Sequence, residues 1–92
     1  MIAILLSTYN GEKFVGEQIE SIISQTNKDW HLYIRDDGSK DSTIKVLDEY
    51  ASKFPKQISI DISCPSNMGA GESFMYLLSV VDADYYMFCD QD

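Results

Sequence analysis

The sequence predicts an α/β fold in which about four strands form a mostly parallel sheet flanked by three helices. Two observations lead to this prediction. Runs of β-branched, aliphatic and aromatic residues alternate along the chain with segments whose apolar residues recur every three or four positions. The strand-like runs also stop at residues that favour turns, such as Gly, Asn, Asp and Ser. Because strand–helix–strand connections of this length are right-handed crossovers, helices are expected on both faces of the sheet.

The length and charge of the chain exclude several classes of protein. Its 92 residues, 45% of them hydrophobic, have room for one core, so residues 1–92 are expected to form a single domain. A net charge of −8 would repel a phosphate backbone, which argues against nucleic acid as a partner. No apolar run approaches the roughly 18 residues of a membrane-spanning helix. Cys64 and Cys89 lack the spacing of a disulfide framework or a zinc site, so a reducing, cytoplasmic compartment fits best.

The first strand and helix are predicted within residues 2–25. Ile2–Leu6 is an unbroken aliphatic run, typical of a strand buried on both faces, and it stops at a polar sequence that begins with Ser7. The segment Glu12–Gln25 predicts an amphipathic helix, because its apolar residues recur at helical spacing. Those apolar residues are Phe14, Val15, Ile19, Ile22 and Ile23.

A second strand and helix are predicted next. The aromatic and branched residues of Trp30–Arg35 predict a strand, which ends at the turn sequence Asp36-Asp37-Gly38-Ser39. Ser42–Phe54 predicts a helix, which Asp41 or Ser42 can cap and which Pro55 ends. The inward face of this helix is expected to consist of Ile44, Leu47, Ala51 and Phe54.

The last third of the chain predicts two more strands with a helix between them. Isoleucines alternate with polar residues over 58–63, which indicates a half-exposed strand at the margin of the sheet. The run Tyr85–Cys89 predicts a buried strand, in which Cys89 would be an inert hydrophobe. The helix between them has an apolar face of Phe74, Leu77, Leu78 and Val81.

Polar clusters follow the predicted strands at residues 7–10, 36–39, 67–69 and 90–92. The carboxyl ends of parallel strands meet at one edge of the sheet, where open α/β sheets bind ligands, so these clusters are expected to converge. We call this edge, with its four clusters, the carboxyl edge. Carboxylates that gather there repel one another unless a cation or a donor-rich ligand compensates them. The sequence therefore implies a divalent metal at the carboxyl edge.

Asp90 and Asp92 are the candidate ligands of that metal. Alternate residues just beyond a strand can project toward one ion while Gln91 faces elsewhere. Carboxylate oxygens suit a hard cation, and phosphate oxygens would complete its shell. The alternative is an acidic tail without a role, but the position after a predicted strand favours the metal site.

Asp37, preferred to Asp36, is the candidate acceptor of hydrogen bonds from a base or a sugar hydroxyl. The alternative is structural: the Asp-Gly pair makes a turn, and Ser39 or Asp41 caps the next helix. Arg35 is the leading candidate to bind a phosphate or a carboxylate, although it can simply pair with a nearby acid.

Residues 7–9 are the candidates for holding a planar base. Tyr9 follows an otherwise aliphatic strand, so its ring can cover a base, while Ser7 and Thr8 offer hydroxyls and backbone amides. Packing of Tyr9 against the first helix is the alternative. His31 begins a predicted strand and is assigned no role.

The segments STYNGEKFVGEQIESIISQT, LYIRDDGSKDST, NMGAGESF and DYYMFCDQD together resemble the N-terminal half of family 2 glycosyltransferases. The resemblance spans essentially the whole chain. It implies a Rossmann-like sheet that is a truncated glycosyltransferase A fold. It also implies inverting transfer of a sugar from a nucleotide diphosphate donor to an acceptor hydroxyl, assisted by Mg²⁺ or Mn²⁺. Residues 1–92 would be the nucleotide-sugar-binding, N-terminal part of the catalytic domain.

The resemblance further implies roles for individual residues. Asp37 would accept a hydrogen bond from the base, and Asp90 would reach the ribose or the metal. Asp92 would hold the metal against both phosphates, where its charge offsets that of the departing diphosphate. The base and ribose would be surrounded by Ser7, Thr8 and Tyr9.

The DQD sequence at 90–92 resembles that of bacterial enzymes which build surface polysaccharides, often from deoxyhexose donors such as rhamnose. It therefore implies a UDP- or dTDP-linked donor and a saccharide or lipid-linked saccharide acceptor. The full-length enzyme would then act in the cytoplasm, at the inner face of the membrane where the acceptor is lipid-linked.

In this family the catalytic base and the acceptor-binding elements follow the DxD motif, so this chain is expected to bind nucleotide without turnover. Asp61, Asp82 and Asp84 are poor substitutes for the base, because they are predicted in an edge strand and in a helix–strand turn, away from the carboxyl edge. Apolar surface that later elements would cover is expected to be exposed, and a homodimer can form through it.

Two alternative functions are weighed against this one. A receiver-like phosphoacceptor domain also gathers carboxylates and Mg²⁺ at strand ends, but it needs paired acids after the first strand, where this chain has STYN. A non-enzymatic nucleotide- or Mg-binding module would use Asp37 and Asp90 only to cap and turn. Stabilisation by nucleotide distinguishes a binding edge from a purely structural one.

Overall fold

We describe the protein from a computed structural model, which describes residues 1–25, 29–37, 39–61 and 70–90, the side chains of 70–74 and 90 excepted. Strands and helices alternate in the predicted order. They are β1 (Ile2–Thr8), α1 (Val15–Ile23), β2 (Trp30–Asp36), α2 (Thr43–Lys53), β3 (Ile58–Asp61), α3 (Ala70–Val80) and β4 (Tyr85–Asp90).

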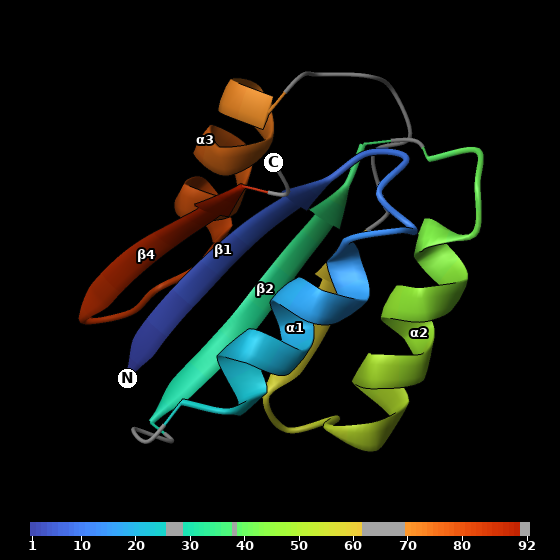
Figure 1. Ribbon diagram of the computed structural model, residues 1–92. Helices are drawn as coiled ribbons and strands as arrows, with labels where there is room; N and C mark the ends of the chain where they lie inside the picture. The colour runs from blue at the N-terminus through green and yellow to red at the C-terminus, as the bar shows by residue number, and fades with distance from the viewer. Residues whose placement is uncertain (26–28, 38, 62–69, 91–92) are drawn as a thin grey trace.

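The strands form one sheet in the order β3-β2-β1-β4, and every pair of neighbours is parallel. The predicted α/β fold and the marginal position of β3 are confirmed. In Figure 1, α1 and α2 cover one face of the sheet and α3 covers the other. The chain steps outward from β1 to β2 and β3, then returns to the far side of β1. The order thus reverses between β1 and β4, and such a reversal is where open α/β sheets bind ligands.

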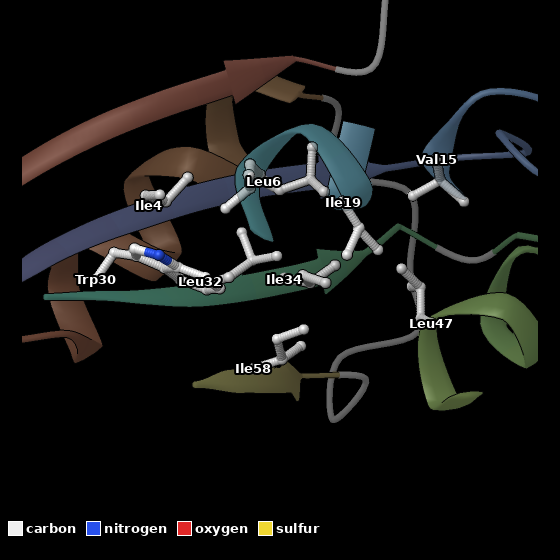
Figure 2. Close-up of a cluster of buried hydrophobic side chains, with 10 residues drawn as sticks. Ile4, Leu6, Val15, Ile19, Trp30, Leu32, Ile34, Leu47 and Ile58 are labelled. Carbon is white, nitrogen blue, oxygen red and sulfur yellow. The ribbon is translucent and has the colours of Figure 1, made fainter. Parts of the chain in front are cut away.

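The main core lies between the sheet and helices α1 and α2. Ile4 and Leu6 of β1 point into it with Leu32 and Ile34 of β2, as Figure 2 shows. Ile19 of α1 is fully buried over them, and burying such a side chain contributes roughly 1.5–3 kcal/mol. The even-numbered residues of β1 therefore face α1 and α2.

A smaller core lies on the opposite face, where the odd-numbered residues of β1 meet α3. Ala3 and Leu5 are fully buried there against Leu77 and Val81. Because β1 is covered on both faces, the prediction of a doubly buried first strand is confirmed.

The first helix begins at Val15 rather than at Glu12. Asn10 has a positive φ of 49°, and the Phe14 and Val15 amides both donate to the Gly11 carbonyl, which makes a turn before the helix. Phe14 precedes the helix and is 59% exposed, so its predicted place on the inward face is wrong.

The prediction that β4 is a buried strand is also wrong. Tyr85, Met87 and Phe88 are 71%, 49% and 56% exposed, because among the described residues β4 pairs only with β1, and α3 packs over β1 and β2 instead. Cys89 is half-buried beside the main core, where it accepts a hydrogen bond from Gln18 Nε2 at 3.7 Å. The residues of β4 are those of a covered strand, but the described part of the chain covers them incompletely.

Candidate functional site

The four strands reach the carboxyl edge in one row. Ser7 on β1 is in register with Arg35 on β2 and with Asp90 on β4. Arg35 is in turn in register with Asp61, the last residue of β3. The expectation that Asp61 lies away from this edge is therefore wrong, because β3 ends level with its neighbour.

Asp84 lies at the opposite end of the sheet, as expected of a residue in the helix–strand turn. Its carboxylate accepts a hydrogen bond from the amino group of Met1 at 2.9 Å. The same amino group is 3.4 Å from Asp29 Oδ2. Asp29 and Asp84 therefore lie at the end of the sheet where the strands begin, which we call the amino edge, opposite the candidate residues of the carboxyl edge.

Asp36 joins the ends of β1 and β2. Its buried carboxylate accepts a hydrogen bond from the Thr8 hydroxyl at 2.8 Å. It also accepts from the amide and the hydroxyl of Ser39, at 2.7 and 2.6 Å. The amide of Asp37 donates to the Thr8 carbonyl at 2.8 Å, which extends the parallel pairing by one residue. Asp36 thus connects the ends of β1 and β2 to Ser39.

The loop after β1 is bonded directly to the loop after β2. The Asn10 amide donates to Ser39 Oγ, and the Lys40 amide donates to Asn10 Oδ1, both at 2.8 Å. The Gly11 amide donates to Thr43 Oγ1, also at 2.8 Å. The two loops run side by side at the upper right of Figure 1. Sequence reasoning missed this connection, although the left-handed preference of Asn before Gly was a signal.

Asp41 caps α2. Ser42 precedes the helix but makes no side-chain capping bond, whereas Asp41 Oδ1 accepts from the Thr43 amide at 3.0 Å and from the Thr43 hydroxyl. The Thr43 hydroxyl bond is the largest cause that lowers the pKa of Asp41 below its ordinary value. Of the residues proposed as caps, Asp41 fills that role, while Ser39 bonds to Asp36 and Asn10 instead.

Arg35 and Asp37 form a buried ion pair. Arg35 Nη1 donates to Asp37 Oδ1 at 2.8 Å, and the two side chains are only 1% and 7% exposed. The guanidinium carbon of Arg35 lies 5.9 Å from the centre of the Tyr76 ring on α3. The interpretation that Arg35 pairs with a nearby acid is confirmed. Tyr76 was missed, because it lies outside the apolar spacing that identified the face of α3.

The three residues at the end of β1 differ in exposure. Ser7 and Thr8 are buried, whereas Tyr9 is 39% exposed at the start of the loop. The Thr8 hydroxyl donates its proton to Asp36, so it can offer a ligand only its oxygen. Tyr9 is thus accessible at the surface and directly follows Thr8, whose carbonyl accepts from the Asp37 amide.

The predicted metal ligands fall at the limit of the described structure. The backbone of Asp90 is in register with Ser7, while its side chain and Asp92 lie outside the described residues. Among the residues that the structure describes, no three His, Cys, Asp or Glu side chains gather as a metal site would require. The donor chemistry nevertheless fits Mg²⁺ or Mn²⁺, since β4 ends in a carboxylate residue next to Ser7 at the reversal point.

Comparison with known proteins identifies a family over nearly the whole chain. Residues 3–92 match the family model for glycosyl transferase family 2. The dTDP-rhamnosyl transferase RfbG of Shigella flexneri is 40% identical over 90 residues, which are 95% of this chain and 31% of that protein. The chain thus spans about a third of the length of this relative.

Solved structures show the same fold. The structure of S. aureus TarS 1-349 in complex with UDP has a TM-score of 0.85 at 23% identity, covering 99% of this chain and 27% of that one. The mannosyltransferase PcManGT from Pyrobaculum calidifontis, in complex with GDP-Man and Mn²⁺, has a TM-score of 0.87 at 18% identity, with the same coverage of 99% and 27%. The sheet is therefore part of a glycosyltransferase A fold. In the described part of the chain, every helix is too short or too polar to cross a membrane.

Proposed function

The chain belongs to glycosyl transferase family 2, and we propose that its carboxyl edge binds the nucleotide diphosphate of a sugar donor. Residues 1–92 would form the nucleotide-sugar-binding part of a catalytic domain that transfers the sugar, with inversion, to an acceptor hydroxyl. The position of Asp37 carries this proposal. Its carboxylate is fixed by Arg35 just beyond β2, one strand from the reversal point, and its amide donates to the carbonyl of Thr8, the residue before the exposed Tyr9.

Each edge residue has a place in this proposal. Asp37 accepts a hydrogen bond from the base, and the ring of Tyr9 covers the base. Ser7 and Thr8 contribute backbone amides and hydroxyl oxygens near the base and ribose. The bond from the Asn10 amide to Ser39 and the buried bond from the Gly11 amide to Thr43 support the assignment, because they fix the loop after β1 before a ligand arrives.

Mg²⁺ or Mn²⁺ is the proposed cofactor. Asp92, with Asp90, would hold the ion, which when bound supplies positive charge to the diphosphate leaving group. The carboxylate residue at the end of β4 supports this choice. The structurally similar mannosyltransferase PcManGT, whose structure is a complex with Mn²⁺, supports it as well. Asp90 is in register with Ser7, so the backbone of Asp90 lies at the same end of the sheet as the proposed base-binding residues.

The donor is proposed to be a UDP- or dTDP-sugar, and the pathway to be bacterial surface polysaccharide synthesis. The similarity to a dTDP-rhamnosyl transferase supports a dTDP-linked deoxyhexose, and the UDP complex of a similar fold supports UDP. The acceptor would be a saccharide or a lipid-linked saccharide. The compartment would be the cytoplasm, at the inner face of the membrane when the acceptor is lipid-linked.

The chain alone is proposed to bind the donor without turnover. It spans about a third of its rhamnosyl transferase relative. The resemblance to family 2 glycosyltransferases implies that the catalytic base follows the DxD motif. We also propose that copies of this chain associate through β4, whose exposed side chains include Tyr85, Met87 and Phe88.

Calorimetric titration with UDP and dTDP, with and without Mn²⁺, tests the proposal. Asp37→Ala is expected to weaken binding about tenfold in both conditions, which corresponds to about 1.4 kcal/mol. Asp92→Ala is expected to weaken it only when Mn²⁺ is present. Asp48→Ala, an exposed acid on α2, is the matched control and leaves affinity unchanged. Unchanged affinity in both Asp37 and Asp92 variants contradicts the site.

A further inference from the structure

Arg35 is a buried cation on the α3 face of the sheet. It occupies the last row but one of β2, where its neighbours in register are Ser7 on β1 and Asp61 on β3. The side chain is 1% exposed and contacts Asp37 at 2.8 Å and the ring of Tyr76 at 5.9 Å from the guanidinium carbon. A charge buried this deeply is destabilising unless a fixed counter-charge accompanies it.

The pair with Asp37 supplies that counter-charge and also restrains Asp37. A guanidinium presents its N–H groups in a rigid planar fork, so the bond from Nη1 defines where Asp37 Oδ1 lies. The ring of Tyr76 lies 5.9 Å from the carbon of the same group, which ties the orientation of the fork to α3. The carboxylate is therefore fixed in both charge and direction by residues from two elements.

The charge state of Asp37 decides which bases it can recognise. An ionised carboxylate only accepts hydrogen bonds, whereas a protonated one also donates. Uracil, thymine and guanine carry a ring N–H that donates to a carboxylate. Cytosine and adenine present a bare ring nitrogen at the corresponding position, which repels it. A carboxyl group buried without its cation would favour the protonated form and lose this selectivity.

We propose that Arg35 is a positioning residue for nucleotide selection: it holds Asp37 as an oriented carboxylate, so that the edge selects bases with a ring N–H donor. The inference rests on the proposed function, because it assumes that Asp37 contacts the base. UDP and CDP are the sharpest pair of probes, since they differ only at the ring nitrogen and the neighbouring exocyclic group.

The test measures the affinities of UDP and CDP, with Mg²⁺, for the wild-type chain and for Arg35→Met, Arg35→Gln and Arg35→Lys. The wild type is expected to bind UDP at least about tenfold more tightly than CDP, as one well-placed hydrogen bond allows. Arg35→Met and Arg35→Gln, which lack the charge, are expected to reduce that ratio to about threefold or less. Arg35→Lys keeps the charge, so its preference for UDP over CDP is expected to lie between that of the uncharged variants and that of the wild type.

A control separates selection from stability. Leu47→Ala removes a fully buried side chain of α2, so it lowers the thermal midpoint, but it is expected to keep the wild-type UDP/CDP ratio. All titrations are made at a temperature where circular dichroism shows each variant folded, and Arg35→Gln decides the result if Arg35→Met does not fold. A wild-type ratio in the uncharged variants overturns the inference alone. Failure of the wild type to bind either nucleotide overturns the proposed function and this inference with it.

Discussion

The hydroxyl of Thr8 donates a 2.8 Å hydrogen bond to the carboxylate of Asp36, which lies 28 positions later in the chain. This bond joins the last residues of β1 and β2, which are also in register in the sheet. Asp36 passes the connection on to Ser39, and Ser39 accepts from the Asn10 amide. Hydrogen bonds within the protein therefore hold the ends of β1 and β2 together. The two neighbouring acids have different partners, because Asp36 binds Thr8 and Ser39 whereas Asp37 forms an ion pair with Arg35.

Removing the Asp36 carboxylate should destabilise the fold. Asp36→Ala deletes the acceptor of three hydrogen bonds, from Thr8 and Ser39, and leaves the buried Thr8 hydroxyl without that partner. At about 1 kcal/mol for each bond, the free energy of unfolding should fall by about 2–4 kcal/mol. Urea unfolding of the wild type and the variant measures this difference in the free energy of unfolding. Asp48→Ala, on the exposed face of α2, serves as control, and an equal effect of both substitutions would refute the structural role.

The cap of α2 should make stability depend on acidity. Donation from Thr43 lowers the pKa of Asp41 in the folded state, so the unfolded chain takes up this proton at higher pH. The stabilisation is therefore complete above the ordinary pKa of aspartate, about 4, and is lost as the pH falls through the lower folded value. Asp41→Asn keeps an acceptor but cannot titrate there.

Urea unfolding at pH 6 and at pH 3 checks this dependence. The wild type should lose more stability than Asp41→Asn between the two values, while Asp48→Asn should follow the wild type. If the wild type and Asp41→Asn lose the same stability on acidification, the cap does not titrate as the structure indicates.

The exposed residues of β4 should drive self-association. Met87 and Phe88 lie on opposite faces of β4, which within the described part of the chain pairs with β1 alone. Sedimentation equilibrium should detect a dimer that is strengthened by salt, because salt screens the repulsion between copies that each carry a net charge of −8. Phe88→Lys should weaken it, whereas Phe14→Lys, at the start of α1, should not. A monomer at every concentration and salt would rule out this association.

Local patterns predicted most of the fold because burial on a covered strand leaves a clear signature. The aliphatic run of β1 and the helical spacing of α2 correspond closely to the observed elements. β4 has the same apolar signature but lies at an edge of the sheet with several exposed side chains, so an apolar run does not by itself show that a strand is covered. The start of α1 was predicted three residues too early, at Glu12 instead of Val15, because Asn10 turns the chain before the helix and apolar spacing does not indicate such a turn.

The sequence predicted which residues lie at the candidate site better than it predicted the contacts between them. Strand ends located Asp37 and Tyr9 at one edge, and the pairing of Arg35 with an acid was among the alternatives. The bonds of Asn10 and Thr43, and the contact with Tyr76, depend on how loops and α3 approach each other in space. The family match argues against the receiver-like alternative, as did the absence of acids after β1.

NMR of the backbone amides can locate a nucleotide diphosphate and a divalent metal at the carboxyl edge. UDP is added with Mg²⁺ to observe shifts, then trace Mn²⁺ is added to broaden the signals of residues near the ion. We expect the signals of Thr8, Tyr9, Asp37 and Asp90 to shift or broaden, while those of Ile2, Trp30 and Tyr85, at the other ends of the same strands, stay unchanged. Broadening centred on Asp29 and Asp84 at the amino edge, or no response to UDP at any residue, would contradict this expectation.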